Sequence, residues 1–530
     1  MKISAAARLA GRNTIGEALR RAAAVFRDAP ALHFRERTWS FHALDAGADR
    51  VARRLLSLGL VKGDRVLAYG RNSDSFLLLW LGCARAGLVH VPANYALTAA
   101  ELEYVARQSG ATALIHDAVG AVTAARVAAD CAITRVGTFT GEAGLDILST
   151  AQDPAWDAGD GAELPDDVTD NDIAQILYTS GTTGLPKGAA HAHTALLAQY
   201  ASCIVAFELR AEERALAALP LYHTAQMHAF TMPLLLVGAE SVLIESPVPA
   251  DCLELIERHR LSSFFAPPTV WISLLRHADF STRDLTRLEK IYYGASIMPL
   301  PVLRELRARL PGARPFHAYG QTEIAPLATV LKPEEHDARP TSVGRPVLNV
   351  RTRVVGPDMQ DMKPGQHGEI VHRSPQLLLF YWDKPEETAE AFLGGWFHSG
   401  DIGFFDEDGF LYVVDRVKDV INTGGVLVAS REVEDALFTH PAVSEVAVIA
   451  LPDARWIEAV TAVVVLRPGQ QVDEAALIAH ARETLAPFKV PKRVIFAPNL
   501  PKNTAGKLLK RELRVTYSGQ ESAVMGLGSS

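Results

Sequence analysis

The stretch Thr179-Ser180-Gly181-Thr182-Thr183-Gly184-Leu185-Pro186-Lys187-Gly188 places three glycines, four hydroxyl side chains and one lysine directly after the apolar run Ile173–Tyr178. Glycine permits close backbone approach, so successive N–H groups of such a loop can point at one anion while hydroxyls donate from the sides. Pro186 removes a backbone donor, and no serine or threonine follows Lys187, so the segment differs from the P-loop. We predict a strand-to-loop hairpin that holds phosphates; an ordinary Gly/Thr turn is the alternative.

Composition limits the class of protein. The chain has 530 residues, 48% of them hydrophobic, and a formal net charge of −8. An acidic chain offers no basic field, so nucleic acid is excluded as a partner. No apolar run reaches the about 18 residues that a bilayer span needs, so we expect no membrane span. The four cysteines lie far apart without C-x-x-C spacing, which favours free thiols in a reducing cytoplasm.

The patterning along the chain predicts its domains. Apolar runs and helical patterns alternate from residue 40 to 120 and again beyond residue 172, as in layered α/β structure. Short strands between Gly, Asp and Pro turns predict a small β-rich subdomain from Val350 to Val414. We therefore expect an α/β fold with a large N-terminal domain of several subdomains at residues 1–415. A smaller α+β C-terminal domain follows at residues 419–518, with a disordered tail at residues 519–530.

Four further segments carry residues suited to nucleotide chemistry. In Tyr319-Gly320-Gln321-Thr322-Glu323 a carboxylate beside a hydroxyl follows a strand-like run, which suits a Mg²⁺–phosphate site. Asp401 follows a glycine turn and could accept hydrogen bonds from two ribose hydroxyls. Alternating charges at Asp415–Asp419 and a lysine, Lys507, beside Gly506 complete the set. Taken singly, a surface turn, a solvated linker and a surface lysine are the alternative interpretations.

Together and in this order, the five segments resemble the adenylate-forming enzymes, the superfamily of acyl- and aryl-CoA synthetases, peptide-synthetase adenylation domains and luciferases. The resemblance covers about residues 14–515 and is more specific than any one motif. It implies an active site between the large domain and a mobile C-terminal domain, joined by a hinge at residues 416–418. It also implies ATP, Mg²⁺ and coenzyme A, the last as the acyl acceptor.

The resemblance implies which residues hold the nucleotide. Those that would wrap the β- and γ-phosphates of ATP are Thr179, Ser180, Gly181, Thr182, Thr183, Gly184 and Lys187. The turn formed by Gly294, Ala295 and Ser296 would lie against adenine, and Tyr319 and Gly320 belong to the same nucleotide site. Asp401 and Arg416 would bind the ribose hydroxyls.

The resemblance also implies the residues of the reaction. Thr322 would contact the α-phosphate, and Glu323 and Thr183 would hold Mg²⁺. Attack of a carboxylate on ATP brings two anions together, so charge neutralisation by Lys507 matters more than proton transfer. Lys418 would be the hinge residue. Rotation there would bring the loop Thr423-Gly424-Gly425 toward a pantetheine tunnel, where a thiol converts the acyl-AMP into a thioester.

The acid is predicted to be hydrophobic. His223 is implied to lie next to the substrate carboxylate, with a core or turn histidine as the alternative. Residues 221–235 contain no Asp or Glu, which disfavours an amino-acid substrate. The pocket candidates are apolar or small: Met227, Trp271, Tyr293, Gly294, Ala295, Ala318 and Ile324. They favour a fatty or aryl acid, although Trp271 and Tyr293 are core aromatics in the alternative interpretation.

The acceptor is less well defined by the sequence. No carrier domain follows Arg514, so we expect a freestanding ligase that uses coenzyme A. The chain has Val426-Leu427-Val428-Ala429-Ser430 where many relatives have Glu-Asn-aromatic-Pro character, a change that could alter the thiol step or repack a loop. An adenylating enzyme that passes its acyl group to a carrier protein or an amine stays open, as does a non-catalytic nucleotide-binding protein. A second copy of the chain, in a homodimer, is a further partner to consider.

Overall fold

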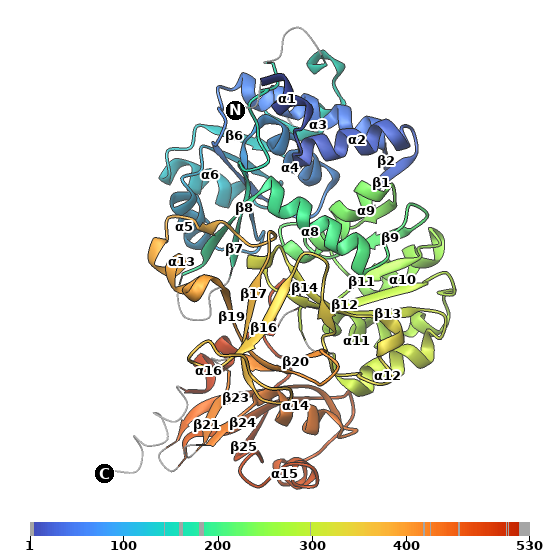
Figure 1. The fold of residues 1–530 in the computed structure, drawn as a ribbon. Helices are drawn as coiled ribbons and strands as arrows, with labels where there is room; N and C mark the ends of the chain where they lie inside the picture. The colour runs from blue at the N-terminus through green and yellow to red at the C-terminus, as the bar shows by residue number, and fades with distance from the viewer. Residues whose placement is uncertain are drawn as a thin grey trace.

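The described residues form four β-sheets and the helices that cover them (Figure 1). The structure is a computed structural model, and it describes residues 5–141, 144–157, 163–179, 185–296, 298–416, 419–423, 426–453, 456–504, 506 and 508–518. The tail predicted at residues 519–530 lies outside these residues. The first three sheets form the upper and middle parts of Figure 1, and the fourth forms the lower part.

The first sheet carries the predicted phosphate hairpin. Its order is β18 (Phe380–Tyr381), β8 (Lys187–Ala192), β7 (Ile173–Thr179), β4 (Val89–Ala93), β3 (Arg65–Tyr69), β5 (Ala113–His116) and β6 (Arg135–Thr138). Alternation along β3 places Val66 and Ala68 in one core and Leu67 and Tyr69 in another. Both faces of this sheet are therefore covered.

The second sheet supplies strand ends to the site. Its order is β15 (Arg345–Pro346), β14 (Leu327–Leu331), β13 (Arg314–Gly320), β12 (Lys290–Gly294), β11 (Ser263–Phe265), β9 (Arg214–Ala217), β10 (Glu240–Leu243), β1 (Pro30–Phe34) and β2 (Arg37–Ser40). Strands β9 to β13 pair in parallel, and β12 is buried along its whole length. Such strands are typical of α/β layers, in which ligands bind at the carboxyl ends.

The third sheet is small and antiparallel, and the fourth belongs to the C-terminal domain. The third has the order β16 (Arg351–Val355), β17 (Gly368–Arg373), β19 (Phe397–Phe405) and β20 (Leu411–Arg416). The fourth contains β22 (Val426–Val428), β21 (Ile421–Thr423), β24 (Ile457–Leu466), β23 (Val443–Asp453) and β25 (Arg493–Phe496). The predicted β-rich subdomain and α+β C-terminal domain are thus confirmed.

Helices connect and cover the sheets. The α-helices are α1 (Ala5–Ala10), α2 (Ile15–Phe26), α3 (Phe41–Ser57), α4 (Asp74–Ala86), α5 (Ala99–Ser109), α6 (Ala121–Asp130), α7 (Ile147–Gln152), α8 (His193–Ala206), α9 (Met232–Val237), α10 (Pro249–Arg258), α11 (Pro268–Arg276), α12 (Leu300–Arg309), α13 (Pro385–Ala391), α14 (Ser430–Phe438), α15 (Glu474–Arg482) and α16 (Lys510–Ser518). The 3-10 helices are η1 (Pro154–Trp156), η3 (Ala278–Ser281), η4 (Thr322–Ile324), η5 (Pro333–Glu335) and η6 (Leu393–Gly395), and η2 (Ala225–Thr231) is a π-helix. Among the described residues, no helix is long and apolar enough to cross a bilayer.

Two local predictions need correction. Asp401 does not follow a separate glycine turn, because β19 runs through it from Phe397 to Phe405, with Gly400 at φ +70° inside the strand. Likewise, β13 extends through Tyr319 and Gly320, which were placed after the strand. Asp401 pairs with Arg416 of β20, which continues that ladder past Gly400, and Gly320 pairs with Leu327 as the last residue of β13. A local sequence window does not contain that partner.

A buried ion pair ties β12 to the segment after α8. The Lys290 ammonium donates to the carbonyls of Phe207 at 3.0 Å and Glu208 at 2.6 Å and to the Glu213 carboxylate at 2.6 Å. Both charged side chains are at least 90% shielded from solvent. Removing one partner would leave a buried charge without its counter-ion, which is costly.

We therefore expect Glu213→Leu to lower the free energy of unfolding by about 3 kcal/mol, measured by denaturant titration. The control is Glu254→Leu, which breaks the exposed i,i+4 pair with Arg258 and should change stability by less than about 0.5 kcal/mol. Equal shifts in the two variants would contradict this account of the pair.

Candidate active site

The predicted phosphate hairpin is present. Strands β7 and β8 pair antiparallel, and Thr179 lies opposite Lys187 at the end of the ladder where the loop joins the two strands. The two ends of the phosphate loop are therefore held side by side. The loop residues Ser180, Gly181, Thr182, Thr183 and Gly184 lie outside the described residues, so their predicted roles stay predictions.

A tyrosine joins the two predicted anion-handling side chains. Tyr381, on β18 beside β8, donates its hydroxyl to Glu323 Oε1 at 2.9 Å. The Lys187 ammonium lies 5.1 Å from the centroid of the same ring, within cation–π range. Burial, followed by the negative charge of Glu323, raises the pKa of Tyr381, so the phenol keeps its proton and can donate. Glu323, Tyr381 and Lys187 thus form one cluster, although they come from distant segments.

Sequence reasoning missed Tyr381. It lies in a strand of only two residues, with no phosphate or metal motif around it. The aromatic run Phe380-Tyr381-Trp382 before a proline was the one available signal. Its partner strand β8 is almost 200 residues earlier in the chain, which no local pattern shows.

Thr322 faces the segment that contains His223. The Thr322 and Thr224 hydroxyl oxygens are 3.4 Å apart, and the His223 backbone N–H donates to the Pro220 carbonyl at 3.1 Å. His223 is half-buried. The structure therefore brings Thr322, Glu323 and His223 to one region, as expected.

A second cluster matches the predicted ribose site. Asp401 is opposite Arg416 in the β19–β20 ladder, and its Oδ1 lies 3.3 Å from Arg416 Nε. Its other oxygen accepts the Tyr319 hydroxyl at 2.7 Å. Burial, followed by the charge of Asp401, raises the pKa of Tyr319. Each carboxylate oxygen still has capacity to accept from a bound hydroxyl.

Two glycines let the backbone close in around this cluster. A Cβ on Gly320 would lie 1.8 Å from the Pro326 carbonyl oxygen, and one on Gly294 would lie 2.3 Å from that of Ala318. Neither position tolerates a side chain without backbone movement. Ala295, in the predicted adenine turn, adopts φ +63°, which non-glycine residues rarely do.

Both aromatic pocket candidates are part of the core. Trp271 donates its indole N–H to the Tyr292 carbonyl at 3.1 Å, and the Tyr293 hydroxyl is 2.9 Å from His336 Nε2. Both are 1% exposed, and Met227 and Ile324 are fully buried. Trp271 and Tyr293 are therefore core aromatics, as the alternative interpretation of these two side chains has it. Ala318 keeps partial exposure at the end of β13.

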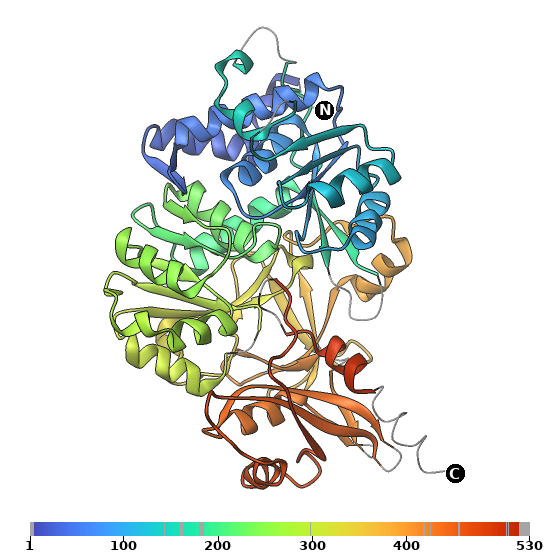
Figure 2. The same cartoon turned by 180° about the vertical axis from the view of Figure 1, so that it is seen from behind.

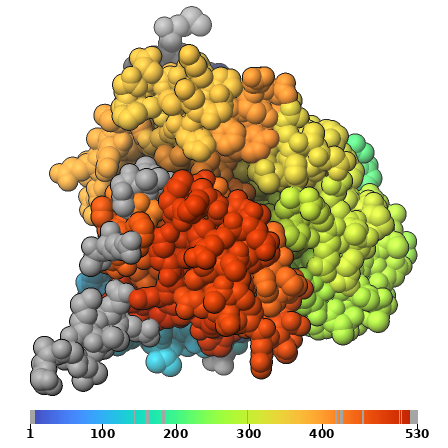
Figure 3. All heavy atoms as spheres, turned by 90° about the horizontal axis from the view of Figure 1, so that it is seen from below, coloured from blue at the N-terminus to red at the C-terminus, as the bar shows by residue number. Residues whose placement is uncertain are grey.

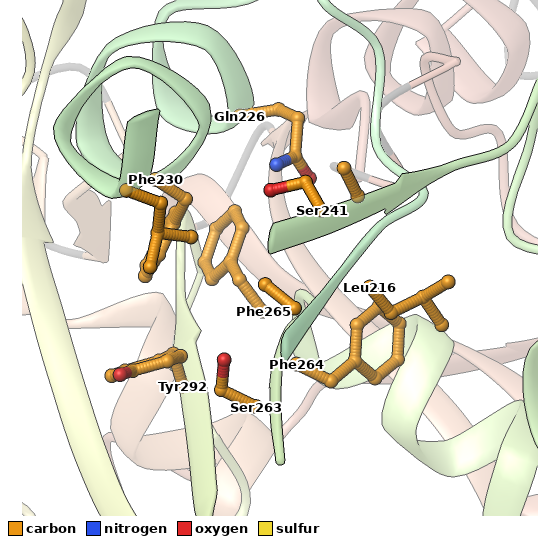
Figure 4. A pocket seen from close by; sticks show the side chains of 11 residues that line it. Leu216, Gln226, Phe230, Ser241, Ser263, Phe264, Phe265 and Tyr292 are labelled. Carbon is orange, nitrogen blue, oxygen red and sulfur yellow. The ribbon is translucent and has the colours of Figure 1, made fainter. Parts of the chain in front are cut away.

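A small cavity lies beside η2 (Figure 4). It borders η2 and the strands β9 to β12, with Gln226, Phe230 and Phe265 among its walls. Phe230 stacks on Phe265 with ring centroids 4.4 Å apart. An aromatic wall thus closes off the interior on this side of η2.

The C-terminal domain reaches the site through the loop before α16. In Figure 2 the red segment ahead of α16 rises from the lower domain toward the second sheet, and Figure 3 shows this domain against its green and yellow neighbours. The Thr269 hydroxyl donates to the Gly506 carbonyl at 3.0 Å, and the Tyr222 and Thr504 hydroxyls are hydrogen-bonded. Sequence reasoning did not identify Thr269. Lys507, the next residue along this loop, lies outside the described residues, as do Lys418, Gly424 and Gly425.

Comparison with known proteins gives independent evidence of the family to which the chain belongs. The family model described as AMP-binding enzyme matches residues 19–382, and the model for the AMP-binding enzyme C-terminal domain matches residues 432–507. The chain is 37% identical over 465 residues to a feruloyl-CoA synthase of an Amycolatopsis species, covering 88% of this chain and 91% of that one. It is 33% identical over 506 residues to the fatty acid–[acyl-carrier-protein] ligase ScoC of Streptomyces coeruleorubidus, covering 93% and 94%. Among solved structures, ATP-bound MatB from Rhodopseudomonas palustris matches with a TM-score of 0.86 and 31% identity, covering 95% of this chain and 99% of that one.

The cluster around Glu323 leads to a test by ligand binding. Tyr381→Phe removes the donor that orients the carboxylate, and a hydrogen bond to a charged group is worth about 1.5–3 kcal/mol. We expect the dissociation constant for Mg·ATP to rise at least about tenfold by titration calorimetry, with little change for ATP in excess chelator. Tyr69→Phe, which removes only a hydroxyl bound to the Leu97 carbonyl, is the control. Equal weakening with and without metal would show that Tyr381 does not act through Glu323.

Proposed function

The chain belongs to the AMP-binding enzyme family, within the adenylate-forming superfamily, and from this premise we propose how its site activates and transfers an acid. It is an AMP-forming acid–thiol ligase that converts a fatty or aryl carboxylic acid to acyl-AMP and then to acyl-CoA. The observation that carries this assignment is the arrangement of two clusters around Thr322. The cluster of Glu323, Tyr381 and Lys187 begins at the residue after Thr322, and that of Asp401, Tyr319 and Arg416 includes the tyrosine three residues before it.

The first step joins the acid to the α-phosphate. A carboxylate oxygen attacks the α-phosphorus, the new O–P bond forms, and the bond to the β-phosphate bridging oxygen breaks to release diphosphate. Lys187 and the phosphate loop hold the leaving β- and γ-phosphates, and Thr322 donates to the α-phosphate. Lys507 adds positive charge where both anions meet. Such fixed charges and donors stabilise the transition state without reorganisation.

The residues present fit a Mg²⁺ ion held jointly with the nucleotide. Mg²⁺ usually takes one or two carboxylates and completes its shell with substrate phosphates and water. Among the described residues no group of three or more His, Cys, Asp or Glu could hold a metal by itself, whereas Glu323 offers one oriented carboxylate. Bound there, Mg²⁺ supplies charge neutralisation for the phosphates. Thr183 is proposed as its second protein ligand.

The nucleoside is held by the other cluster. Asp401 and Arg416 would bind the ribose hydroxyls, with Tyr319 and the turn of Gly294, Ala295 and Ser296 against the base. The backbone approaches closely at Gly294, which faces Ala318 of β13, and at Gly320, which faces Pro326, so this surface presents backbone rather than side chains. A flat base suits such a surface.

The second step transfers the acyl group to sulfur. The thiolate of coenzyme A attacks the acyl carbonyl, a C–S bond forms, and the C–O bond to AMP breaks. Rotation about Lys418 would withdraw Lys507 and bring Gly424 and Gly425 to the thiol path. His223 directly precedes Thr224, whose hydroxyl lies 3.4 Å from that of Thr322, and is proposed to border the reacting carboxylate. Four free cysteines, Cys83, Cys131, Cys203 and Cys252, suit a reducing compartment, so a cytoplasmic location is part of this proposal.

A second acceptor is supported by one comparison. The relative from Streptomyces coeruleorubidus is a ligase of fatty acid to acyl-carrier protein, and its first half-reaction would use the same nucleotide site. Transfer of the acyl group to a carrier protein is therefore the alternative to coenzyme A.

The function is tested by mass spectrometry of products from Mg·ATP and a panel of aliphatic and aryl acids, with and without coenzyme A. We expect AMP and acyl-CoA, with the preferred acid among hydrophobic members of the panel. Acyl-AMP that persists in the presence of coenzyme A would favour a carrier protein as acceptor. No ATP consumption with any acid would contradict the assignment.

The two half-reactions should separate at one lysine. We expect Lys507→Ala to reduce acyl-AMP formation by at least about a hundredfold, since it removes a fixed charge from the transition state, while thioester formation from supplied acyl-AMP persists. Lys502→Ala on the same loop, whose partner is Glu445, is the control and should retain both steps. Equal loss of both steps in Lys507→Ala would rule out this division of labour.

A further inference from the structure

Helix α14 of the C-terminal domain is capped by a residue from the other side of the hinge. Its N-cap position is Ala429, whose methyl side chain cannot accept a hydrogen bond. Instead, Asp415 Oδ2 accepts the Ser430 backbone N–H at 2.6 Å and the Ser430 hydroxyl at 2.8 Å. Asp415 lies on β20 of the third sheet, before residues 416–418. We propose that Asp415 and Ser430 are positioning residues that hold the C-terminal domain in the acid-activating orientation. This inference rests on the proposed function.

The contact between Asp415 and Ser430 is buried. Ser430 is 0% exposed and Asp415 is 7% exposed, so neither group exchanges its partner freely with water. The other Asp415 oxygen accepts the Arg416 N–H at 2.8 Å. A carboxylate at a helix N-terminus also interacts favourably with the helix dipole. Separating the pair would leave a buried carboxylate and two donors to be satisfied elsewhere.

The contact continues into the segment that carries the catalytic lysine. The Lys510 ammonium donates to Ser430 Oγ at 2.6 Å and pairs with Glu434 at 2.7 Å. Lys510 is the first residue of α16 and lies three positions after Lys507. Asp415, Ser430 and Lys510 therefore form a continuous polar chain from the N-terminal domain to the start of α16.

In the orientation that has the Asp415–Ser430 contact, the loop before α16 also contacts the N-terminal domain. Thr504 and Gly506 are bound by Tyr222 and Thr269 at the same time. A Cβ on Gly506 would lie 2.7 Å from Thr269 Oγ1, so the loop lies tightly against α11. The Asp415–Ser430 contact thus coincides with docking of the loop beside Lys507 at the site.

A contact made in one of two orientations shifts the equilibrium between them. Rotation at the hinge leaves Asp415 with the third sheet and carries Ser430 away with α14. Only interactions that differ between the orientations change their populations. Loss of the two hydrogen bonds should therefore move the protein toward the thioester-forming orientation, at least about tenfold by the usual strength of charge-assisted bonds.

The position of Ser430 allows a graded test without loss of the helix. It is the first residue of α14, where proline is favoured because its missing N–H is not needed by the helix. Ala429 has φ −71° and ψ 120°, which suits a residue before proline. Ser430→Ala removes the hydroxyl alone, whereas Ser430→Pro removes both donors.

If Asp415 only stabilised α14, its loss should lower stability without changing the balance between the two half-reactions. Asp473 caps α15 in the same domain, accepting from Ala476 N–H at 2.8 Å, and has no role across the hinge. Asp473→Ala therefore serves as the matched control. It should lower the melting temperature and leave the ratio of the two half-reaction rates unchanged.

The experiment measures both half-reactions on the full chain: diphosphate release with acid and Mg·ATP, and acyl-CoA formation from supplied acyl-AMP. We expect the ratio of the first rate to the second to fall about tenfold in Ser430→Pro and about threefold in Ser430→Ala. An unchanged ratio in Ser430→Pro, or the same change in Asp473→Ala, would overturn the proposal.

A distance measurement separates this proposal from the proposed function. Spin labels at Val205→Cys on α8 and Val515→Cys on α16, both exposed, in a Cys131→Ser background, report domain orientation without substrates. We expect one dominant distance for the parent and a second population in Ser430→Pro. Identical distributions would refute the positioning role even if no acid proved to be a substrate. A shifted distribution with no ATP consumption would support positioning and reject only the enzymatic assignment.

Discussion

The carboxylate of Asp401 is the point on which the site depends. It is 4% exposed and lies on the third sheet, and its two oxygens bind Tyr319 of the second sheet and Arg416 of its own. A buried charge is tolerated only when it is paired and hydrogen-bonded. Joining the two sheets and shaping the proposed ribose site are therefore the same interaction. Arg416 is also the first residue of the hinge predicted at residues 416–418, so this pair lies at the predicted domain boundary.

Much of this could be predicted from the sequence, where the signal was local. The phosphate hairpin follows from an apolar strand, a glycine-rich loop and a second strand, all within about twenty residues, and the structure pairs Thr179 with Lys187 accordingly. The layered domains followed from the alternation of apolar runs with helical patterns. Tyr381 and Thr269 could not be found in this way, because each acts on a residue far away in the chain. Trp271 and Tyr293 show a related limit, since an apolar pattern does not distinguish a pocket wall from a core.

The corrections have a common cause. A glycine in sequence suggests a turn, but Gly400 lies within a strand and Gly320 is the last residue of one, because a neighbouring strand pairs with each segment. At Gly320 the reason for glycine is the carbonyl of Pro326 across the strand pair, not freedom to turn. The sequence shows that a side chain is missing, and only the tertiary structure shows what occupies its space.

The loop that precedes α16 meets the large domain through hydroxyl groups and a carbonyl, at Tyr222, Thr504, Thr269 and Gly506. Coulombic attraction between exposed charges weakens as ionic strength rises, whereas contacts between neutral groups do not depend on it in this way. These two contacts should therefore keep their strength when the salt concentration changes. In the proposed function, charged nucleotides would enter and leave beside contacts of the loop that do not depend on charge.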